Sequence, residues 1–315
     1  MVGGMNNRSP HWSQTSSRLM CACPRAWALT YGSRQKTPLS RKDRTARGSQ
    51  PPRTVDEVMV RAMRAAWQQK IADLYDRKVW TTAYAKRTLS RLVCDMLEEQ
   101  RLTLPDLLLE QKIALALRQL NQLEHVHALR PLFNGEPRRW AFFDRRDPVS
   151  LNGLNLYAAP DLAVFHQNRW TLIRLQFRTP HANPMGQQLE HLLAVLWALQ
   201  QTGFPDDAGS FRMKVVAWRG SRWHEHHLEV TPQSLHQARL LALHDVQEMN
   251  WLTRWANADP TMSTLPLAAH HRTCERCVHR KGCPAETGLA KAKRIQEHLT
   301  RHEPHKAPTK SARTE

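Results

Sequence analysis

Four of the six cysteines in this 315-residue chain stand in two short patterns near its ends. Cys23 opens a Cys-Pro-Arg-Ala-Trp segment near the start. Near the end, Cys274, Cys277 and Cys283 form a Cys-x2-Cys-x5-Cys pattern that is followed at once by Pro284. Four thiolates are the usual ligand set of an iron–sulfur cluster. The spacing therefore predicts that one thiolate from the start joins three from the end around a single inorganic centre.

Zinc is the main alternative for this centre, because sites of four cysteines, or of three cysteines and a histidine, are common. His271 and His279 lie beside the C-terminal cysteines, and Cys21 is a substitute for Cys23. Against zinc, the chain has no second Cys-x2-Cys pair that would complete a zinc ribbon. We expect a [4Fe–4S] cluster, with Zn as the alternative, that staples together segments about 250 residues apart.

The charge of the chain points to a polyanionic partner. It carries 46 Lys and Arg against 28 Asp and Glu, which gives a formal net charge of +18 at pH 7. Such a surplus favours nucleic acid, because each neutralised phosphate releases condensed counterions. The cysteines are too few for a disulfide scaffold. Residues 1–10 lack the apolar core of a signal peptide, and no apolar run reaches the length of about 18 residues that spans a membrane. We expect a cytoplasmic protein that does not bind membranes.

Composition and hydrophobic period indicate an α/β fold made of several segments. We expect the following order: residues 1–15 disordered, 16–34 the N-terminal Cys-Pro-Arg helical segment, 35–53 a basic linker, 54–130 a helical subdomain, 131–260 an α/β core, 261–290 the C-terminal cysteine motif, and 291–315 a basic tail. Cys94 lies beside the apolar stripe of the helical subdomain and is interpreted as a core residue.

Within residues 131–260 the apolar period changes to two, which predicts strands. The predicted strands are residues 139–144, 151–158, 161–165 and 170–178, followed by a hairpin of 211–219 and 222–230 across Gly220-Ser221. Helices are predicted at 186–201 and from 231 to about 255, the latter with Thr231 as N-cap and Pro232 as its first residue.

Asp161 opens one predicted strand, and Gln176 follows fifteen positions later on the next. The helix after them contains Gln188-Leu189-Glu-His-Leu192. This arrangement resembles the PD-(D/E)XK nuclease superfamily, in which an aspartate begins one strand, an acid-x-lysine lies on the next, and a Gln-Leu-x-x-Tyr motif follows. With the cysteines included, the chain is similar to the RecB-type branch that carries an iron–sulfur cluster, which includes the AddB helicase–nuclease domain and the CRISPR-adaptation exonucleases.

The resemblance implies a restriction-endonuclease-like core, meaning a mixed central sheet flanked by helices, with an inserted N-terminal helical subdomain. It implies a DNA exonuclease that acts on ends or single strands, with a role in DNA repair and a helicase or recombination partner. Asp161 would hold Mg²⁺ or Mn²⁺, and Gln188 would orient phosphate or water. The cluster ligands would be Cys23, Cys274, Cys277 and Cys283.

The second motif departs from the family, because Gln176 and Arg178 stand at the acid and lysine positions. Strand alternation puts Arg174, Gln176 and Arg178 on one face, so two cations and an amide stand where a metal needs anions. Arg178 would also compete for Asp161 through a bidentate pair. We expect a pocket that receives phosphate and hydrolyses it poorly or not at all.

Three functional interpretations follow from the sequence. The first is a metal-dependent exonuclease, in which Glu190 or Glu136 would supply the missing acid. The second is a catalytically inactive DNA-binding module derived from such a nuclease. The third is a zinc-stabilised scaffold whose basic surface meets nucleic acid or a protein.

Overall fold

The computed structural model describes residues 11–32, 53–137, 139–178, 185–259, 262, 264–268, 270–275 and 277–286. The chain divides into two compact units. Unit 1 comprises residues 1–18 and 52–251, and unit 2 comprises residues 19–51 and 252–315. None of the helices in the described ranges is long and apolar enough to cross a membrane.

A mixed five-stranded sheet forms the centre of unit 1. Its strand order is β2 (Arg139–Phe142), β5 (Leu162–His166), β6 (Arg169–Gln176), β7 (Phe211–Arg219) and β8 (Arg222–Leu228). All neighbouring pairs are antiparallel except β6 and β7, which run parallel. A parallel pair needs a crossover connection, and the helix α8 (Met185–Ala198) lies in that connection. The predicted α/β class is confirmed, and these strands lie within a few residues of their predicted positions.

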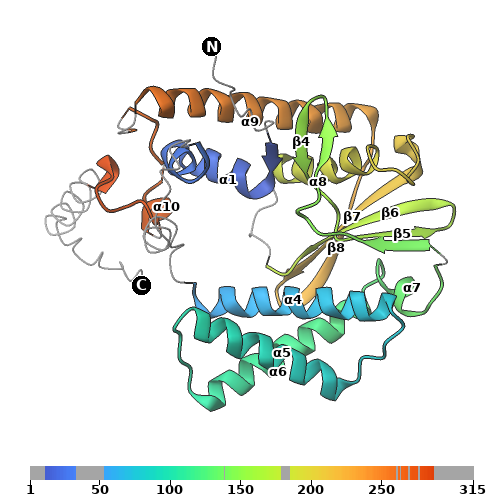
Figure 1. The fold of residues 1–315 in the computed structure, drawn as a ribbon. Helices are drawn as coiled ribbons and strands as arrows, with labels where there is room; N and C mark the ends of the chain where they lie inside the picture. The colour runs from blue at the N-terminus through green and yellow to red at the C-terminus, as the bar shows by residue number, and fades with distance from the viewer. Residues whose placement is uncertain are drawn as a thin grey trace, which may run out of the picture. The chain divides into compact units, whose positions relative to one another are not determined.

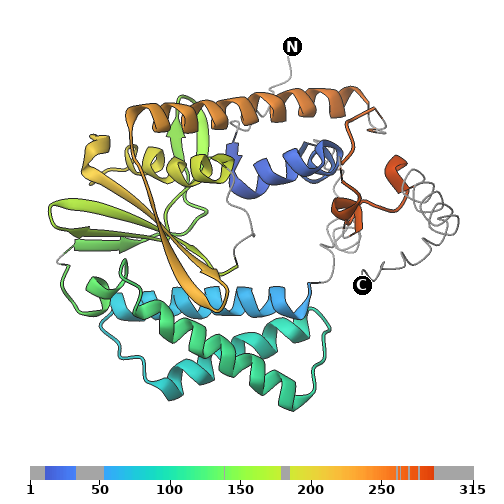
Figure 2. The same ribbon diagram turned by 180° about the vertical axis from the view of Figure 1, so that it is seen from behind.

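Helices cover both faces of this sheet (Figures 1 and 2). On one side lie α4 (Val55–Tyr75), α5 (Thr82–Glu99), α6 (Asp106–Glu124) and α7 (Arg130–Phe133); on the other lie α8 and α9 (Pro232–Ala258). The alternation of β6 explains this layering, because Ile173 and Leu175 join the core beneath α4–α7 while Leu172 joins the core beneath α8 and α9. The helices α4, α5 and α6 lie within the range 54–130 that was predicted to be helical, and Ile173 and Leu175 are both buried.

The prediction that residues 1–15 are disordered is wrong for its last part. His11–Ser13 form the strand β1, which pairs in parallel with β4 (Leu154–Tyr157), and β4 pairs in turn with β3 (Val149–Leu151). The single strand predicted at 151–158 is therefore two strands. Asn152 and Gly153 have φ of 52° and 78°, the left-handed pair of a tight hairpin turn, so the Asn-Gly dipeptide was the missed signal.

A buried carboxylate holds the N-terminal segment onto unit 1. Trp12 is fully buried, and its indole Nε1 donates a hydrogen bond of 2.8 Å to Asp245 on α9. The hydroxyl of Ser17, on α1 (Gln14–Ala22), donates to the same carboxylate oxygen at 2.5 Å. Because the indole and the hydroxyl satisfy Asp245 inside the core, residues 12–17 are part of the folded structure.

Unit 2 contains short helices at or next to the predicted cysteine ligands. These are α2 (Pro24–Trp27), a π-helical turn (Ala28–Gly32) and α10 (His271–Glu275). The Arg25 amide donates to Pro266 O at 3.2 Å, and Arg25 Nε donates to Met262 O at 3.0 Å, so the two ends of the chain meet inside this unit. The predicted tail at 291–315 and all of the predicted linker except Arg53 lie outside the described residues.

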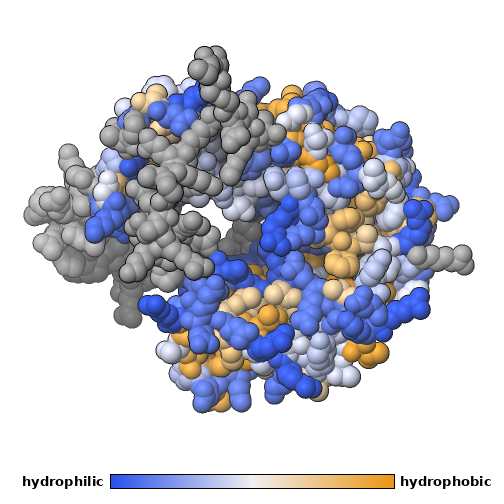
Figure 3. All heavy atoms as spheres, in the orientation of Figure 1, coloured by the Kyte–Doolittle hydropathy of each residue, from blue (hydrophilic) through white to orange (hydrophobic). Residues whose placement is uncertain are grey.

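The face of the molecule in Figure 3 mixes hydrophilic and hydrophobic residues, with orange spheres among the blue over the lower helices. Leu107 and Leu115 of α6 are exposed hydrophobic residues of the helical layer. Cys94 of α5 is exposed as well, so its interpretation as a core residue is wrong. It lies next to buried Val93, one position off the apolar stripe.

Candidate functional site

Asp161, at the start of β5, is already saturated with hydrogen bonds. Its Oδ1 accepts from Arg145 Nε at 2.8 Å, while its Oδ2 accepts from Arg145 Nη2 at 2.6 Å and from the Leu175 amide at 2.7 Å. Arg145 Nη2 also donates to Leu175 O at 3.0 Å, which fixes the guanidinium against the sheet. A carboxylate engaged in this way is a poor ligand for Mg²⁺, because a full positive charge stands where the ion would bind.

The pKa of Asp161 reflects this pairing. Burial alone would raise it, but the charge and hydrogen bonds of Arg145, the charge of Arg174 and the Leu175 amide together lower the pKa below its ordinary value. Burial would also lower the pKa of Arg145, and Asp161 outweighs that effect and raises it. The two side chains therefore remain a charged pair throughout the neutral range.

The side chains of the second motif split between the interior and the surface. Arg174 is only 2% exposed, and its Nη1 donates to Ala159 O at 2.6 Å. Gln176 lies 2.8 Å from His191 Nε2 of α8, whereas Arg178 is exposed. The predicted competition of Arg178 for Asp161 is wrong, because the arginine that makes the bidentate pair is Arg145, from the loop after β2.

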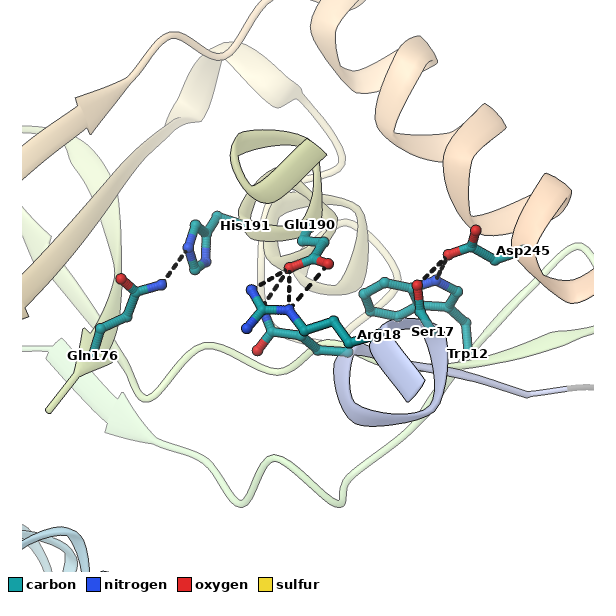
Figure 4. A network of polar contacts seen from close by, with 8 residues as sticks. Trp12, Ser17, Arg18, Gln176, Glu190, His191 and Asp245 are labelled. Carbon is teal, nitrogen blue, oxygen red and sulfur yellow. Dashed lines mark hydrogen bonds and ion pairs between the residues drawn. The ribbon is translucent and has the colours of Figure 1, made fainter. Parts of the chain in front are cut away.

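Arg174 and His191 sit in an environment that disfavours added positive charge. Burial, together with the charges of Arg145 and Arg64, lowers the pKa of Arg174 to about 9. Burial and the nearby charge of Arg174 also lower the pKa of His191 to about 3, so its imidazole is neutral at physiological pH. The amide of Gln176 can then donate to Nε2 of the neutral ring, as drawn in Figure 4.

The carboxylates considered as replacement acids are not available. Glu190 on α8 accepts from Gln14 Nε2 at 2.8 Å and from Arg18 Nη2 at 2.6 Å (Figure 4). Glu136 lies 3.6 Å from His166, at the opposite end of β5 from Asp161. A strand rises about 3.3 Å per residue, which puts Glu136 on the order of 16 Å from the site. Gln188, predicted to orient phosphate, is exposed on the first turn of α8.

Four arginines, Arg64, Arg145, Arg146 and Arg174, line a pocket of about 770 Å³ in unit 1, here called the arginine pocket. Burial and the charge of Arg145 lower the pKa of Arg64. The other lining residues are His11, Ser13, Gln14, Thr15, Asn155 and Tyr157. Arg145 pairs with Asp161 and Arg146 with Asp144, but in the part of the chain that the structure describes, neither Arg64 nor Arg174 forms an ion pair. The pocket therefore has a surplus of cations and a marked preference for anions.

Unit 2 brings the four predicted cysteines together. Cys23, Cys274, Cys277 and Cys283 all line one small cavity, here called the cysteine cavity. Cys23 is the N-cap of α2, and its sulfur accepts a hydrogen bond from Ala26 N at 3.4 Å.

The thiols of the cysteine cavity are close enough to affect one another. Burial, followed by the neighbouring Cys23, Cys277 and Cys283, raises the pKa of Cys274. Burial also raises the pKa of Cys277. A metal centre would have to displace these protons, so its binding would weaken at acidic pH.

The donor set of the cysteine cavity fits an iron–sulfur cluster or zinc in type and number. Among the described residues, no group of three or more His, Cys, Asp or Glu side chains is arranged to hold a metal ion. The alternative zinc ligands lie outside the cavity. His279 is 3.2 Å from Thr30 Oγ1, His271 faces Glu275, and Cys21 is exposed.

The aromatic and histidine residues of β8 have structural roles. Trp223 Nε1 donates to Gln119 O at 2.8 Å, and its ring packs edge-on against Phe177 and Trp218. His224 accepts a hydrogen bond from Arg222 at 3.3 Å.

No protein-family model and no characterised protein matches this sequence. The site is accordingly defined by its own geometry. Sequence reasoning missed Arg64 and Arg145, which decide its chemistry. The available signal was the Arg145-Arg146 pair, placed directly after the predicted strand 139–144 and therefore near the start of the strand that Asp161 opens.

Proposed function

We propose that this chain is a DNA-binding protein with a restriction-endonuclease-like core in which an arginine pocket has replaced the catalytic metal site. An aspartate at the start of β5, its antiparallel neighbour β6, and the crossover through α8 into parallel β7 support this kinship. One observation carries the proposal, namely the bidentate pair between Arg145 and Asp161.

Phosphodiester hydrolysis of the metal-dependent kind needs anionic ligands that hold a divalent ion against the phosphate. Here Asp161 is paired, Gln176 is neutral and bound to His191, and Glu190 is paired with Arg18. The residues around the site therefore do not fit Mg²⁺ or Mn²⁺, and we assign no hydrolytic step to them. This favours the inactive module over the exonuclease.

The arginines that line the arginine pocket are well suited to bind phosphate. Arginine presents a planar fork of donors that matches phosphate oxygens, and buried arginines without carboxylate partners gain the most from an incoming anion. The net charge of +18 supplies long-range attraction for a polyanion. Retention of a [4Fe–4S] cluster, or of zinc, in the cysteine cavity would stabilise unit 2 without taking part in chemistry.

The test is fluorescence anisotropy with single-stranded DNA in Mg²⁺ and in EDTA, over a series of KCl concentrations. We expect binding that is unchanged by EDTA and weakens steeply with salt, because phosphate contacts release counterions. Arg64→Gln should weaken binding by about tenfold, the equivalent of roughly 1.4 kcal/mol. The matched control is Arg91→Gln, an exposed arginine on α5 outside the pocket, which should change binding by less than about twofold.

Three outcomes would overturn the proposal. Binding that requires Mg²⁺ would show that the site still works through a metal. Equal loss of affinity in Arg64→Gln and Arg91→Gln would show that the pocket is not the binding site. RNA offered in competition that binds at least about tenfold better than DNA would reassign the partner to RNA.

A further inference from the structure

The arginine pocket has a closed side, and this bears on what part of a DNA strand it takes. The strand β1 pairs with β4 along one wall, where His11 and Ser13 stand opposite Asn155 and Tyr157. Trp12, which lies between them, is fully buried and anchored to Asp245. The wall is thus a fixed part of the fold.

The arginine pocket includes a deeply buried cation. Arg174 lines the pocket although only 2% of it is exposed, and the charges of Arg64 and Arg145 both disfavour its own. A strand running along the protein surface would present singly charged phosphodiesters and would not reach a side chain buried to this degree. A group that can be inserted into the pocket is required.

From this geometry we propose that the arginine pocket binds the terminal phosphate of a DNA strand. The inference rests on the proposed DNA-binding function and narrows it to strand ends. A phosphate monoester carries a charge of about −1.5 to −2 and three acceptor oxygens, whereas an internal diester carries about −1 and two. Only the monoester offers enough charge and enough acceptors for the guanidinium groups of Arg64 and Arg174 together.

The arginine pocket is also suited to the nucleoside that carries this phosphate. His11 and Tyr157 both line it, and their rings form an edge-to-face pair with centroids 6.0 Å apart. Aromatic rings beside a phosphate site commonly stack on an unpaired base. A volume of about 770 Å³ can hold one nucleotide with its phosphate.

The experiment compares oligonucleotides of one sequence, with an internal dye, that carry a 5′-phosphate, a 3′-phosphate or hydroxyls at both ends. We expect the wild-type protein to bind one of the phosphorylated oligonucleotides at least about tenfold more tightly than the hydroxyl form. Whichever end is preferred supports the inference and gives the polarity. A difference of less than about twofold among all three would overturn it while leaving the proposed DNA binding intact. If the wild-type protein binds none of the three oligonucleotides, both the strand-end inference and the proposed DNA binding are wrong.

Variants test whether the preference for a phosphorylated end arises in the arginine pocket. Arg174→Gln and Arg64→Gln should each reduce the preference for the phosphorylated end to within about twofold, while Arg91→Gln keeps the full preference. Arg174 is buried, so its variant is first checked by thermal melting, and Arg64→Gln keeps the test decisive if Arg174→Gln does not fold. A preference that survives Arg64→Gln would place the phosphate elsewhere.

Competition with a mononucleotide distinguishes a pocket that binds a strand end from a pocket that binds a free nucleotide. Deoxyadenosine 5′-monophosphate should displace the phosphorylated oligonucleotide only at concentrations at least about a hundredfold above the oligonucleotide's own Kd, because it lacks the remaining strand contacts. Displacement near that Kd would make the pocket a nucleotide site and would overturn the assignment to strand ends.

Discussion

The cysteine cavity and the arginine pocket are the two places where sequence motifs predict a metal, and they differ in what remains of the ligand set. In the cysteine cavity all four thiols are present and line one cavity. Beside the arginine pocket, Asp161 is the acid of the predicted metal motif, and Arg145, from outside that motif, bonds to both of its oxygens. The cysteine cavity therefore keeps donors of the kind that a metal needs, whereas at Asp161 an arginine occupies the carboxylate.

The two regions also differ in how many separate elements of the chain supply their residues. The C-terminal cysteines are set by short backbone turns, with Cys277 N bonded to Cys274 O at 3.2 Å and Cys283 N bonded to Arg280 O at 2.9 Å. The arginine pocket draws on α4, on the loop after β2, on β6 and on the N-terminal segment. The first region is therefore sensitive to single ligands, and the second to the balance of several charges.

The largest effect is expected from removing one thiol of the cysteine cavity. Cys277→Ser should abolish stoichiometric iron and sulfide, or zinc, and unfold unit 2, because structural metal binding contributes on the order of 10 kcal/mol to folding. Metal and sulfide assays with circular dichroism after anaerobic purification measure both effects. Cys94→Ser, on the exposed face of α5, is the control and should keep full metal content. A metal-free wild-type protein that melts cooperatively would contradict the structural role.

The next largest effect, on the free energy of unfolding, is expected from breaking the ion pair between Arg145 and Asp161. Arg145→Gln leaves Asp161 charged and without its partner, which should destabilise the fold by about 3 kcal/mol. Arg146→Gln is the matched control, since its side chain is 88% exposed and its pair with Asp144 is on the surface, so this variant should unfold at nearly the same urea concentration as the wild type. Urea unfolding of the three proteins measures the difference. Equal destabilisation by both variants would show that the pair with Asp161 is not special.

Lowering the pH is expected to have a smaller effect on the free energy of unfolding. The pKa of Asp161 is lowered in the folded protein, so its pair stabilises the fold above the ordinary value of 3.8 and loses that contribution as the pH falls through the folded pKa. The free energy of unfolding should fall by on the order of 1 kcal/mol from this group. Urea unfolding at pH 6 and about pH 3 should show this loss in the wild type and less of it in Asp161→Asn. Identical pH dependence in the two proteins would mean that Asp161 does not titrate as described.

The smallest effect is expected from restoring the motif alone. The double variant Gln176→Glu with Arg178→Lys recreates the acid and the lysine of the family pattern, yet it should remain unable to cut DNA, because Arg145 still occupies Asp161. Adding Arg145→Ala to the double variant removes that obstacle. Gel assays with Mn²⁺ compare the two. Cleavage by the double variant would show that Gln176 and Arg178, and not Arg145, were the defect.

Much of the fold could be predicted from the sequence because it depends on local patterns. Thr54 forms a capping box with Glu57 at the start of α4, and Thr231 with Pro232 opens α9 as expected. The strand β1 could not be predicted, since three residues of no clear period pair only because Trp12 finds a buried carboxylate on α9.

The site was predictable in position and not in chemistry. The residue types at Gln176 and Arg178 predicted a poor metal site next to Asp161, and the structure adds a bidentate pair of Asp161 with Arg145 that this prediction did not include. The identity of the cation could not be read from strand alternation, which pointed to Arg178. Arg145 reaches Asp161 from a loop, and loop geometry is fixed by tertiary packing, such as the hydrogen bond of 2.8 Å from Trp197 Nε1 to Asp147 O.

The central claim is that Asp161 serves as the counterion of an arginine. The most direct measurement is cleavage of single-stranded and plasmid DNA in Mg²⁺ and in Mn²⁺ by the wild type and by Asp161→Asn, with DNA binding recorded in parallel. The account predicts that both proteins bind DNA and that neither cuts it with either ion. Metal-dependent cutting by the wild type that disappears in Asp161→Asn would contradict the account.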